Sequence, residues 1–249
     1  ITPYYDEPLW MIERNIKSVL FQKMPAGKYV QHVISVDFGG EEADKKVQEI
    51  LAIVKKLCDA NPDTSYECCI GHLDKNMGLP SARNAAIRSA KGHYLFLLDT
   101  DDMMAYPERV EDQITFMENM NLDHSYGGYE EIHGEGKPTG KIVLNTDDMM
   151  EALRKGTNPC FCGSNCFTIK MVKTIGLFDE SMLDGAEDME YWVRAAIHPD
   201  IRSNFLGYRP LYYLGIHGNN MTARYMAEGK FKKAYEYMDQ KHPGFFYKA

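Results

Sequence analysis

The sequence predicts an α/β fold with a Rossmann-like, mostly parallel central sheet that is flanked by helices. Strand and helix patterns alternate through the first hundred residues. The segment 93–99 (HYLFLLD) is a continuous apolar run, which is typical of a strand buried on both faces. A β-α order of this kind places ligand crevices at the carboxyl ends of the strands.

The first half is expected to follow the order β-α-β-α-β-α-β. The strand at 31–37 (QHVISVD) is rich in β-branched residues, and 41–60 carries apolar residues at helical spacing. A helix over 81–90 is stopped by Lys91 and Gly92. In chain order, the expected elements are 1–2, 9–22, 31–37, 41–60, 66–73, 81–90 and 93–99.

After Pro107 the pattern loosens. Helices are expected at 107–120, 146–155 and 188–197, and in a tail over 221–237. Strands are expected at 125–133, 140–144, 163–169 and 210–216, with a short helix that ends at Gly176. Since no flexible linker is visible, we expect a single domain over 1–249, in which a half over 1–102 and a smaller lobe over 103–249 share one core.

Composition excludes some classes of function. The net charge of −8 disfavours a protein that works mainly on nucleic acid or anionic lipid. No run approaches the ~18 apolar residues of a membrane helix. The six cysteines have no recognisable zinc spacing, so we expect free thiols in a reducing compartment, the cytoplasm. Because the first residue is Ile, we expect that the N-terminus was processed or truncated.

Three acids end the apolar run. Asp99, Asp101 and Asp102 lie within four positions. Carboxylates packed this closely raise one another's pKa by repulsion unless a cation is present. A divalent ion that takes oxygen ligands, Mg²⁺ or Mn²⁺, removes that penalty. A solvated acidic turn is the alternative, but the position after a buried strand favours the metal.

Two other segments carry functional side chains. In 76–84 (NMGLPSARN), Gly78 permits a tight turn, and Arg83 opposes the helix dipole, which predicts an anionic partner for it. In 184–194, acids crowd a helix start, where the dipole favours them. Asp188 and Trp192 lie one turn apart, so a carboxylate would stand beside an aromatic platform that suits a sugar.

Together and in this order, these segments resemble the family 2 glycosyltransferases with the GT-A fold, over nearly the whole chain. Residues 1–5 (ITPYY) resemble the opening strand and turn, and 33–37 (VISVD) resemble the second strand and its acid. Residues 76–84 resemble the segment N-x-G-x-x-x-A-R-N, and 99–102 resemble the DxD metal motif. Residues 176–180 (GLFDE), followed by 187–188, resemble the G-x-F-D-E…E-D signature.

The resemblance implies that a sugar moves, with inversion, from a nucleotide-diphospho-sugar (a UDP-sugar is favoured) to an acceptor hydroxyl on a glycan. It implies that the half over 1–102 binds the donor and that the other half binds the acceptor. Asp188 would be the general base, and Mn²⁺ or Mg²⁺ would be held by Asp101, Asp102 and His217. The donor-binding residues would be Thr2, Asp37, Asn76, Gly78, Arg83, Asp99, Asp101 and Asp102. Glu187 and Trp192 would lie on the acceptor side.

Elementary chemistry agrees with this assignment. Breaking a sugar–phosphate bond leaves charge on the diphosphate, which a metal held by Asp102 would neutralise. On the opposite face, a carboxylate must take the acceptor's proton. One departure concerns the nucleobase. Relatives usually carry a second acid after the second strand, and here that position is Phe38, so the choice of uracil over guanine or thymine stays open.

Three alternatives remain. A haloacid-dehalogenase-type phosphatase also has a DxD after a buried strand, but that strand normally opens the domain. A nucleotidyltransferase of similar fold needs a Gly-rich, basic opening loop, and residues 2–7 are neither. A catalytically silent, sugar-nucleotide-binding relative is disfavoured, because Asp99, Asp101, Asp102 and Asp188 are all present.

Overall fold

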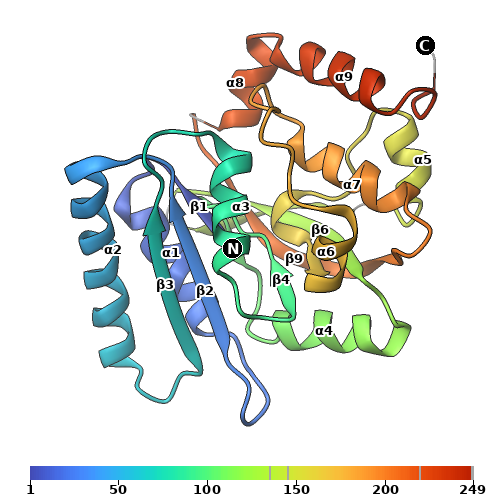
Figure 1. Ribbon diagram of the computed structural model, residues 1–249. Helices are drawn as coiled ribbons and strands as arrows, with labels where there is room; N and C mark the ends of the chain where they lie inside the picture. Colours follow the sequence, from blue (N-terminus) through green and yellow to red (C-terminus); the bar gives the residue numbers. More distant parts are fainter. Residues whose placement is uncertain (135, 145, 219, 248–249) are drawn as a thin grey trace.

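The computed structural model, shown in Figure 1, describes residues 1–134, 136–144, 146–218 and 220–247. The strands form a three-stranded sheet, β1-β2-β3, and a six-stranded sheet, β4-β8-β6-β9-β5, in which β7 also pairs with β6. The strands are β1 (Thr2–Tyr4), β2 (Val30–Val36), β3 (Tyr66–His72), β4 (Tyr94–Phe96), β5 (Met103–Met104), β6 (His124–His133), β7 (Lys137–Val143), β8 (Cys166–Thr168) and β9 (Ser203–Ile216).

Helices cover both sheets. They are α1 (Leu9–Leu20), α2 (Gly40–Ala60), α3 (Leu79–Ser89), α4 (Arg109–Met120), α5 (Met149–Arg154), α6 (Ile169–Ile175), α7 (Glu187–Ile197), α8 (Met221–Ala227) and α9 (Lys230–Lys241), with a short 3₁₀ turn at Cys162–Ser164. In Figure 1 the α8–α9 tail lies along the top of the molecule, next to α7.

The first sheet confirms the predicted parallel α/β pattern. β1 and β3 both pair in parallel with β2. Since successive strand residues face opposite sides, Ile34 and Val36 pack against α1 and α2, while Val33 packs against Ala86 and Ile87 of α3. Helices therefore cover both faces of this sheet.

The apolar run at 93–99 forms a shorter strand than predicted. β4 covers three residues and pairs antiparallel with β8. The chain then continues in extended form beside β1, because the Ile1 N–H donates to Phe96 O (2.9 Å) and the Leu98 N–H donates to Ile1 O (3.0 Å). This extended stretch joins the two sheets and delivers the three following acids to the carboxyl end of β1.

The second sheet mixes both strand directions. β6 and β9 pair in parallel, whereas β4, β5 and β7 have antiparallel partners. The segment predicted as a strand at 163–169 begins with the 3₁₀ turn, the last strand is longer than the expected 210–216, and β5 was not predicted. The tail is two helices separated by Gly229, whose φ is +67°.

Two simpler findings complete the description. All six cysteines are free thiols. Within the described ranges, every helix is too short or too polar to cross a membrane.

Candidate active site

The turn that carries Asp99, Asp101 and Asp102 is fixed by its neighbours. The amide of Asn15, on the buried face of α1, donates to the carbonyl oxygens of Asp99 (2.8 Å) and Asp102 (3.2 Å). The hydroxyl of Thr100 donates to Pro3 O in β1 (2.6 Å). The three acids therefore stand on a turn whose backbone is held by both the first strand and the first helix.

Asp102 is the buried member of this cluster. Its side chain is almost fully enclosed, at 2% exposure, and its Oδ1 accepts from the Gly215 N–H at 2.9 Å. Burial, followed by repulsion from Asp101 and Asp99, raises the pKa of Asp102 well above its ordinary value. A Cβ on Gly215 would lie 2.2 Å from Asp101 O, so only glycine allows β9 to approach the turn this closely. Asp102 thus ties the turn to β9.

Asp101 and His217 meet at a partly exposed position. His217 Nε2 lies 2.9 Å from Asp101 Oδ2, and the hydrogen bond to Asp101 raises the pKa of His217. The Asn220 amide donates to Gly215 O at 2.8 Å and lies 3.4 Å from the same Asp101 oxygen. Two of the three expected metal ligands therefore lie together.

The metal expectation can be tested on this donor set. Within the residues that the structure describes, no three His, Cys, Asp or Glu side chains are grouped to hold an ion by themselves. A carboxylate nevertheless suits Mn²⁺ or Mg²⁺, and an imidazole is a common metal ligand. Mg²⁺ is usually bound by one or two carboxylates plus the phosphates of a substrate. Asp101 and His217 fit a metal that binds together with a donor diphosphate.

The structure corrects the expected role of Arg83. The guanidinium has the predicted anionic partners, but they are protein acids. Nη2 donates to Asp99 Oδ1 (3.0 Å) and Oδ2 (3.1 Å), and Nη1 donates to Glu187 Oε1. Nη2 also lies 3.0 Å from Cys162 Sγ. Because the residue is only 2% exposed, it is enclosed by these partners and does not present a surface to a donor.

Glu187 and Asp188 begin α7 after an unusual backbone turn. Gly185 has φ +91° and Ala186 has φ +60°, a region that non-glycine residues rarely adopt. A side chain on Gly185 would collide with Phe231 and Tyr225 of the tail, which approach its Cβ position to 2.8 Å. The tail and the left-handed turn together set where α7 starts.

The two acids of α7 have different partners. Glu187 is 5% exposed and faces Arg83. Asp188 accepts from the Asn158 amide at Oδ2 (2.9 Å) and from the Met189 N–H at Oδ1 (2.7 Å). Burial raises the pKa of Glu187 to about 7 and also raises the pKa of Asp188, while Arg83 opposes both increases. A carboxylate with a raised pKa is a better proton acceptor than an exposed one.

Asp37, Asn76 and Gly78 lie together in the predicted donor region. Asp37, at the end of β2, accepts from the Met77 N–H at 2.7 Å, and burial raises its pKa. Asn76 Oδ1 accepts from the Gly78 N–H at 3.1 Å, and Gly78 has φ +87°. This loop borders a cavity of about 360 Å³ that reaches Glu187 and the tail. The cavity is lined by Lys75, Asn76, Met77, Gly78, Leu79, Pro80, Met182, Leu183, Gly185, Glu187, Met221 and Tyr225.

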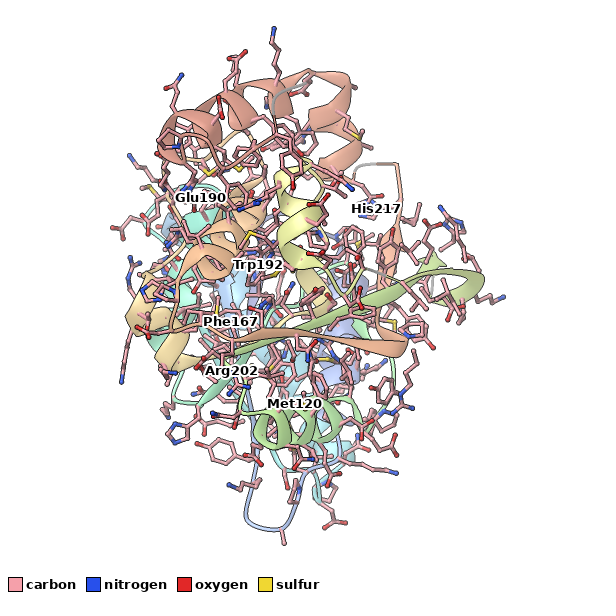
Figure 2. The ribbon with its side chains drawn as sticks, turned by 90° about the vertical axis from the view of Figure 1, so that its right-hand side faces the viewer. Met120, Phe167, Glu190, Trp192, Arg202 and His217 are labelled. Carbon is pink, nitrogen blue, oxygen red and sulfur yellow. The ribbon has the colours of Figure 1, made fainter. Side chains whose placement is uncertain are left out.

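Two predicted contact residues are buried instead. Trp192 has 0% exposure and stacks on His124, with ring centroids 4.6 Å apart. Figure 2 shows it in the interior between Glu190 and Phe167, apart from His217. A ring with no exposed face cannot be a sugar platform, so that prediction is wrong. Thr2 is also fully buried, and its hydroxyl is bonded to His32 Nε2 (2.8 Å), so its side chain does not line the base pocket.

Sequence reasoning missed several supporting residues. Asn15 breaks the apolar face of α1, and this polar residue at a core position was a usable signal. Cys162 and Asn158 come from the irregular segment before β8, and no local pattern marks them. Arg14, which donates to the backbone oxygens of Asp101 and Gly134, was equally unmarked.

Comparisons with known proteins address the family and the fold. Residues 1–175 match the family model described as Glycosyl transferase family 2. The putative teichuronic acid biosynthesis glycosyltransferase TuaG of Bacillus subtilis is 33% identical over 156 residues, which are 61% of this chain and 56% of TuaG. The chain spans only about a fifth of the length of the uncharacterized glycosyltransferase of Rickettsia conorii that it matches.

Two solved structures show the same fold. The S. aureus TarS fragment 1–349 in complex with UDP-GlcNAc has a TM-score of 0.64 at 17% identity, over 89% of this chain and 59% of that one. The mannosyltransferase PcManGT from Pyrobaculum calidifontis, in complex with GDP-Man and Mn²⁺, has a TM-score of 0.62 at 15% identity, over 94% of this chain and 63% of that one. These likenesses establish the GT-A fold.

Proposed function

The chain belongs to glycosyl transferase family 2, and from that premise we propose that it moves a sugar, with inversion, from a nucleoside-diphospho-sugar to an acceptor hydroxyl. The observation that carries the proposal is the placement of the α7 acids. Glu187 is bound to Arg83, and Arg83 is bound to Asp99 in the turn after β4. One guanidinium therefore lies between the start of α7, where the proposed proton acceptor Asp188 follows Glu187, and an acidic turn suited to a metal-bound diphosphate.

Each side has its own task in the reaction. Asp188 is positioned by Asn158 and by the Met189 N–H, so that it can accept the proton of the attacking hydroxyl as the bond to the sugar forms. Asp101 and His217 would hold Mn²⁺ or Mg²⁺, with Asp102 fixing the turn beneath them. When bound, the metal would supply charge neutralisation for the departing diphosphate.

The donor and the acceptor are proposed by chemistry and by likeness. A UDP-sugar is the first candidate because the TarS fragment was solved with UDP-GlcNAc, whereas the GDP-Man complex of PcManGT makes a GDP-sugar the competitor. Asp37 lies at the end of β2, where a nucleobase or ribose would bind. A glycan acceptor is supported by the name of TuaG, which refers to teichuronic acid biosynthesis.

The direct test is a thermal-unfolding titration with UDP, GDP, dTDP and CMP, each with and without Mn²⁺. We expect one nucleoside diphosphate to raise the melting temperature more in the presence of Mn²⁺, since a ligand that binds only the folded state stabilises it. The matching nucleotide-sugar should then release its nucleoside diphosphate when glycan acceptors are added.

The control is Asp44→Asn, which changes an exposed acid on α2 and should respond to ligands as the wild type does. Failure of all four nucleotides to raise the melting temperature, with or without Mn²⁺, would contradict the donor site. Binding without release of the nucleoside diphosphate from any sugar donor would support a silent sugar-nucleotide-binding protein instead.

A further inference from the structure

Arg83 joins two acidic clusters that are far apart in sequence. One terminal nitrogen, Nη2, contacts both oxygens of Asp99 on the donor side. The other, Nη1, contacts Glu187 on the base side, 104 residues further along the chain. A planar guanidinium holds its donors in a rigid fork, so the two carboxylates are fixed relative to each other by a single group.

The charge of Arg83 also acts on Asp188, which follows Glu187 in α7. Several elements place titratable groups around Asp188, in addition to the adjacent Glu187. These groups are Arg83 on α3, Asp99 after β4, Cys160 and Cys162 before β8, and Tyr235 on α9. Arg83 is the cation in this set. Asp99, Glu187 and Asp188 thus depend on one shared positive charge in a buried environment.

We propose that Arg83 is a positioning residue which couples the donor-side turn to the start of α7, and that its charge keeps the Asp188 carboxylate ionised and ready to accept a proton. The inference rests on the proposed function, because it takes Asp188 as the base. It assigns to Arg83 a task that needs no contact with a substrate.

Electrostatics predicts different effects for substitutions at Arg83 and at Glu187. Burial is the main influence that raises the pKa of Asp188, and Arg83 is the main influence that lowers it. Arg83→Gln removes the cation, so Asp188 should hold its proton to a higher pH. Burial raises the pKa of Glu187 to about 7, so Glu187 still holds its proton at lower pH. Glu187→Gln imitates this protonated form and keeps an oxygen that accepts from Arg83, so the pH at which Asp188 loses its proton should stay nearly unchanged.

The test is the pH profile of kcat/KM for sugar transfer. With Arg83→Gln, the acidic limb should move upward, because an opposite charge favours the ionised carboxylate. With Glu187→Gln, the same limb should stay in place. Arg83→Lys, which keeps the charge without the fork, should restore part of the wild-type profile. Arg88→Gln is the matched control, because Arg88 lies on the same helix and pairs with Glu180 at the surface.

A second measurement does not depend on turnover. Carboxyl-carbon NMR titration, with the Asp188 signal assigned by its loss in Asp188→Asn, should show a higher midpoint in Arg83→Gln and an unchanged midpoint in Glu187→Gln. Circular dichroism establishes that each variant is folded, and Arg83→Lys serves if Arg83→Gln is not. If Arg83→Gln loses activity while the Asp188 midpoint stays in place, Arg83 has only a structural role and the inference fails.

The two proposals fail in different ways. A wild-type protein that transfers no sugar while its Asp188 midpoint moves as described would contradict the proposed function alone. An active wild type whose profile and midpoint do not respond to Arg83→Gln would contradict the coupling alone.

Discussion

The turn after β4 and the start of α7 each bring several carboxylates together in a partly buried place. The two regions differ in the partners that these carboxylates have. In the turn, every acid has its own partner: Asp99 has Arg83, Asp101 has His217, and Asp102 has the Gly215 N–H. At α7, Glu187 and Asp188 are adjacent, and only Glu187 contacts a cation directly.

The difference follows from backbone geometry. An extended turn directs successive side chains to different neighbours, so its charges can be neutralised one by one. A helix start places consecutive acids on one small surface, where the N-terminal dipole favours them but burial does not. Burial raises the pKa of both α7 acids, as it raises the pKa of Asp102 in the turn. A raised pKa makes an ionised carboxylate a stronger proton acceptor, which suits a base, while the partly exposed Asp101 suits a cation.

The largest expected effect comes from the α7 side. Asp188→Asn keeps the shape and the Asn158 contact but removes the proton acceptor, so kcat should fall by about 10²–10⁴-fold, the usual contribution of a general base. Nucleoside diphosphate binding, measured by calorimetry, should stay within about twofold, because the donor side is untouched. Asp184→Asn, an acid of the preceding loop, is the control. Transfer by Asp188→Asn at the parent rate would remove Asp188 from the mechanism.

The second prediction concerns the pH dependence of stability. Burial raises the pKa of Glu187 from an ordinary 4.5 to about 7. Between these values the folded state binds more protons than the unfolded state, so this contribution is present below about pH 4.5 and is lost as the pH rises through 7. At about 1.4 kcal/mol for each tenfold change in proton affinity, the loss can reach roughly 3 kcal/mol.

Urea unfolding of the wild type and of Glu187→Gln at several pH values isolates this contribution. The wild type should lose stability relative to the variant as the pH increases from 4.5 to 7, since glutamine does not titrate. A difference in unfolding free energy that is constant across this range would show that Glu187 is ionised throughout.

The parallel half of the fold was predictable because its signals are local. The β-branched run of β2 indicates a strand, and the apolar spacing of α2 indicates a helix. The order of the elements then predicts that the acids lie at the carboxyl ends of the strands. The long partnership of β6 with β9 was not predictable in this way, because it joins segments about eighty residues apart.

The sequence predicted which residues belong to the site better than it predicted what those residues contact. Arg83 was expected to have an anionic partner, but nothing in the sequence tells that the partner is Glu187 and not a phosphate. Trp192 lies one turn after Asp188 on α7, yet a helix enclosed on several sides buries even the residues that share a face with a functional acid. Which elements cover a helix is a tertiary property that the pattern of one helix does not contain.

The third and smallest expected effect compares two adjacent acids of the turn. Asp102→Ala leaves the buried Gly215 N–H without its acceptor, which should lower the free energy of unfolding by about 1–3 kcal/mol. Asp102→Asn keeps an acceptor oxygen without a desolvated charge, so it should be at least as stable as the wild type. Asp101→Asn disturbs a partly exposed pair with His217 and should cost about 1 kcal/mol or less.

Urea unfolding at neutral pH measures all three variants, and a Mn²⁺-dependent nucleotide titration separates the two positions by function. Asp101→Asn should lose the Mn²⁺-dependent part of the thermal shift while it remains stable, and Asp102→Asn should keep stability. If Asp101→Asn proved more destabilising than Asp102→Ala, the buried acid would not be the one that ties the turn to β9. The assignment of one neighbour to the fold and the other to the metal would then have to be reversed.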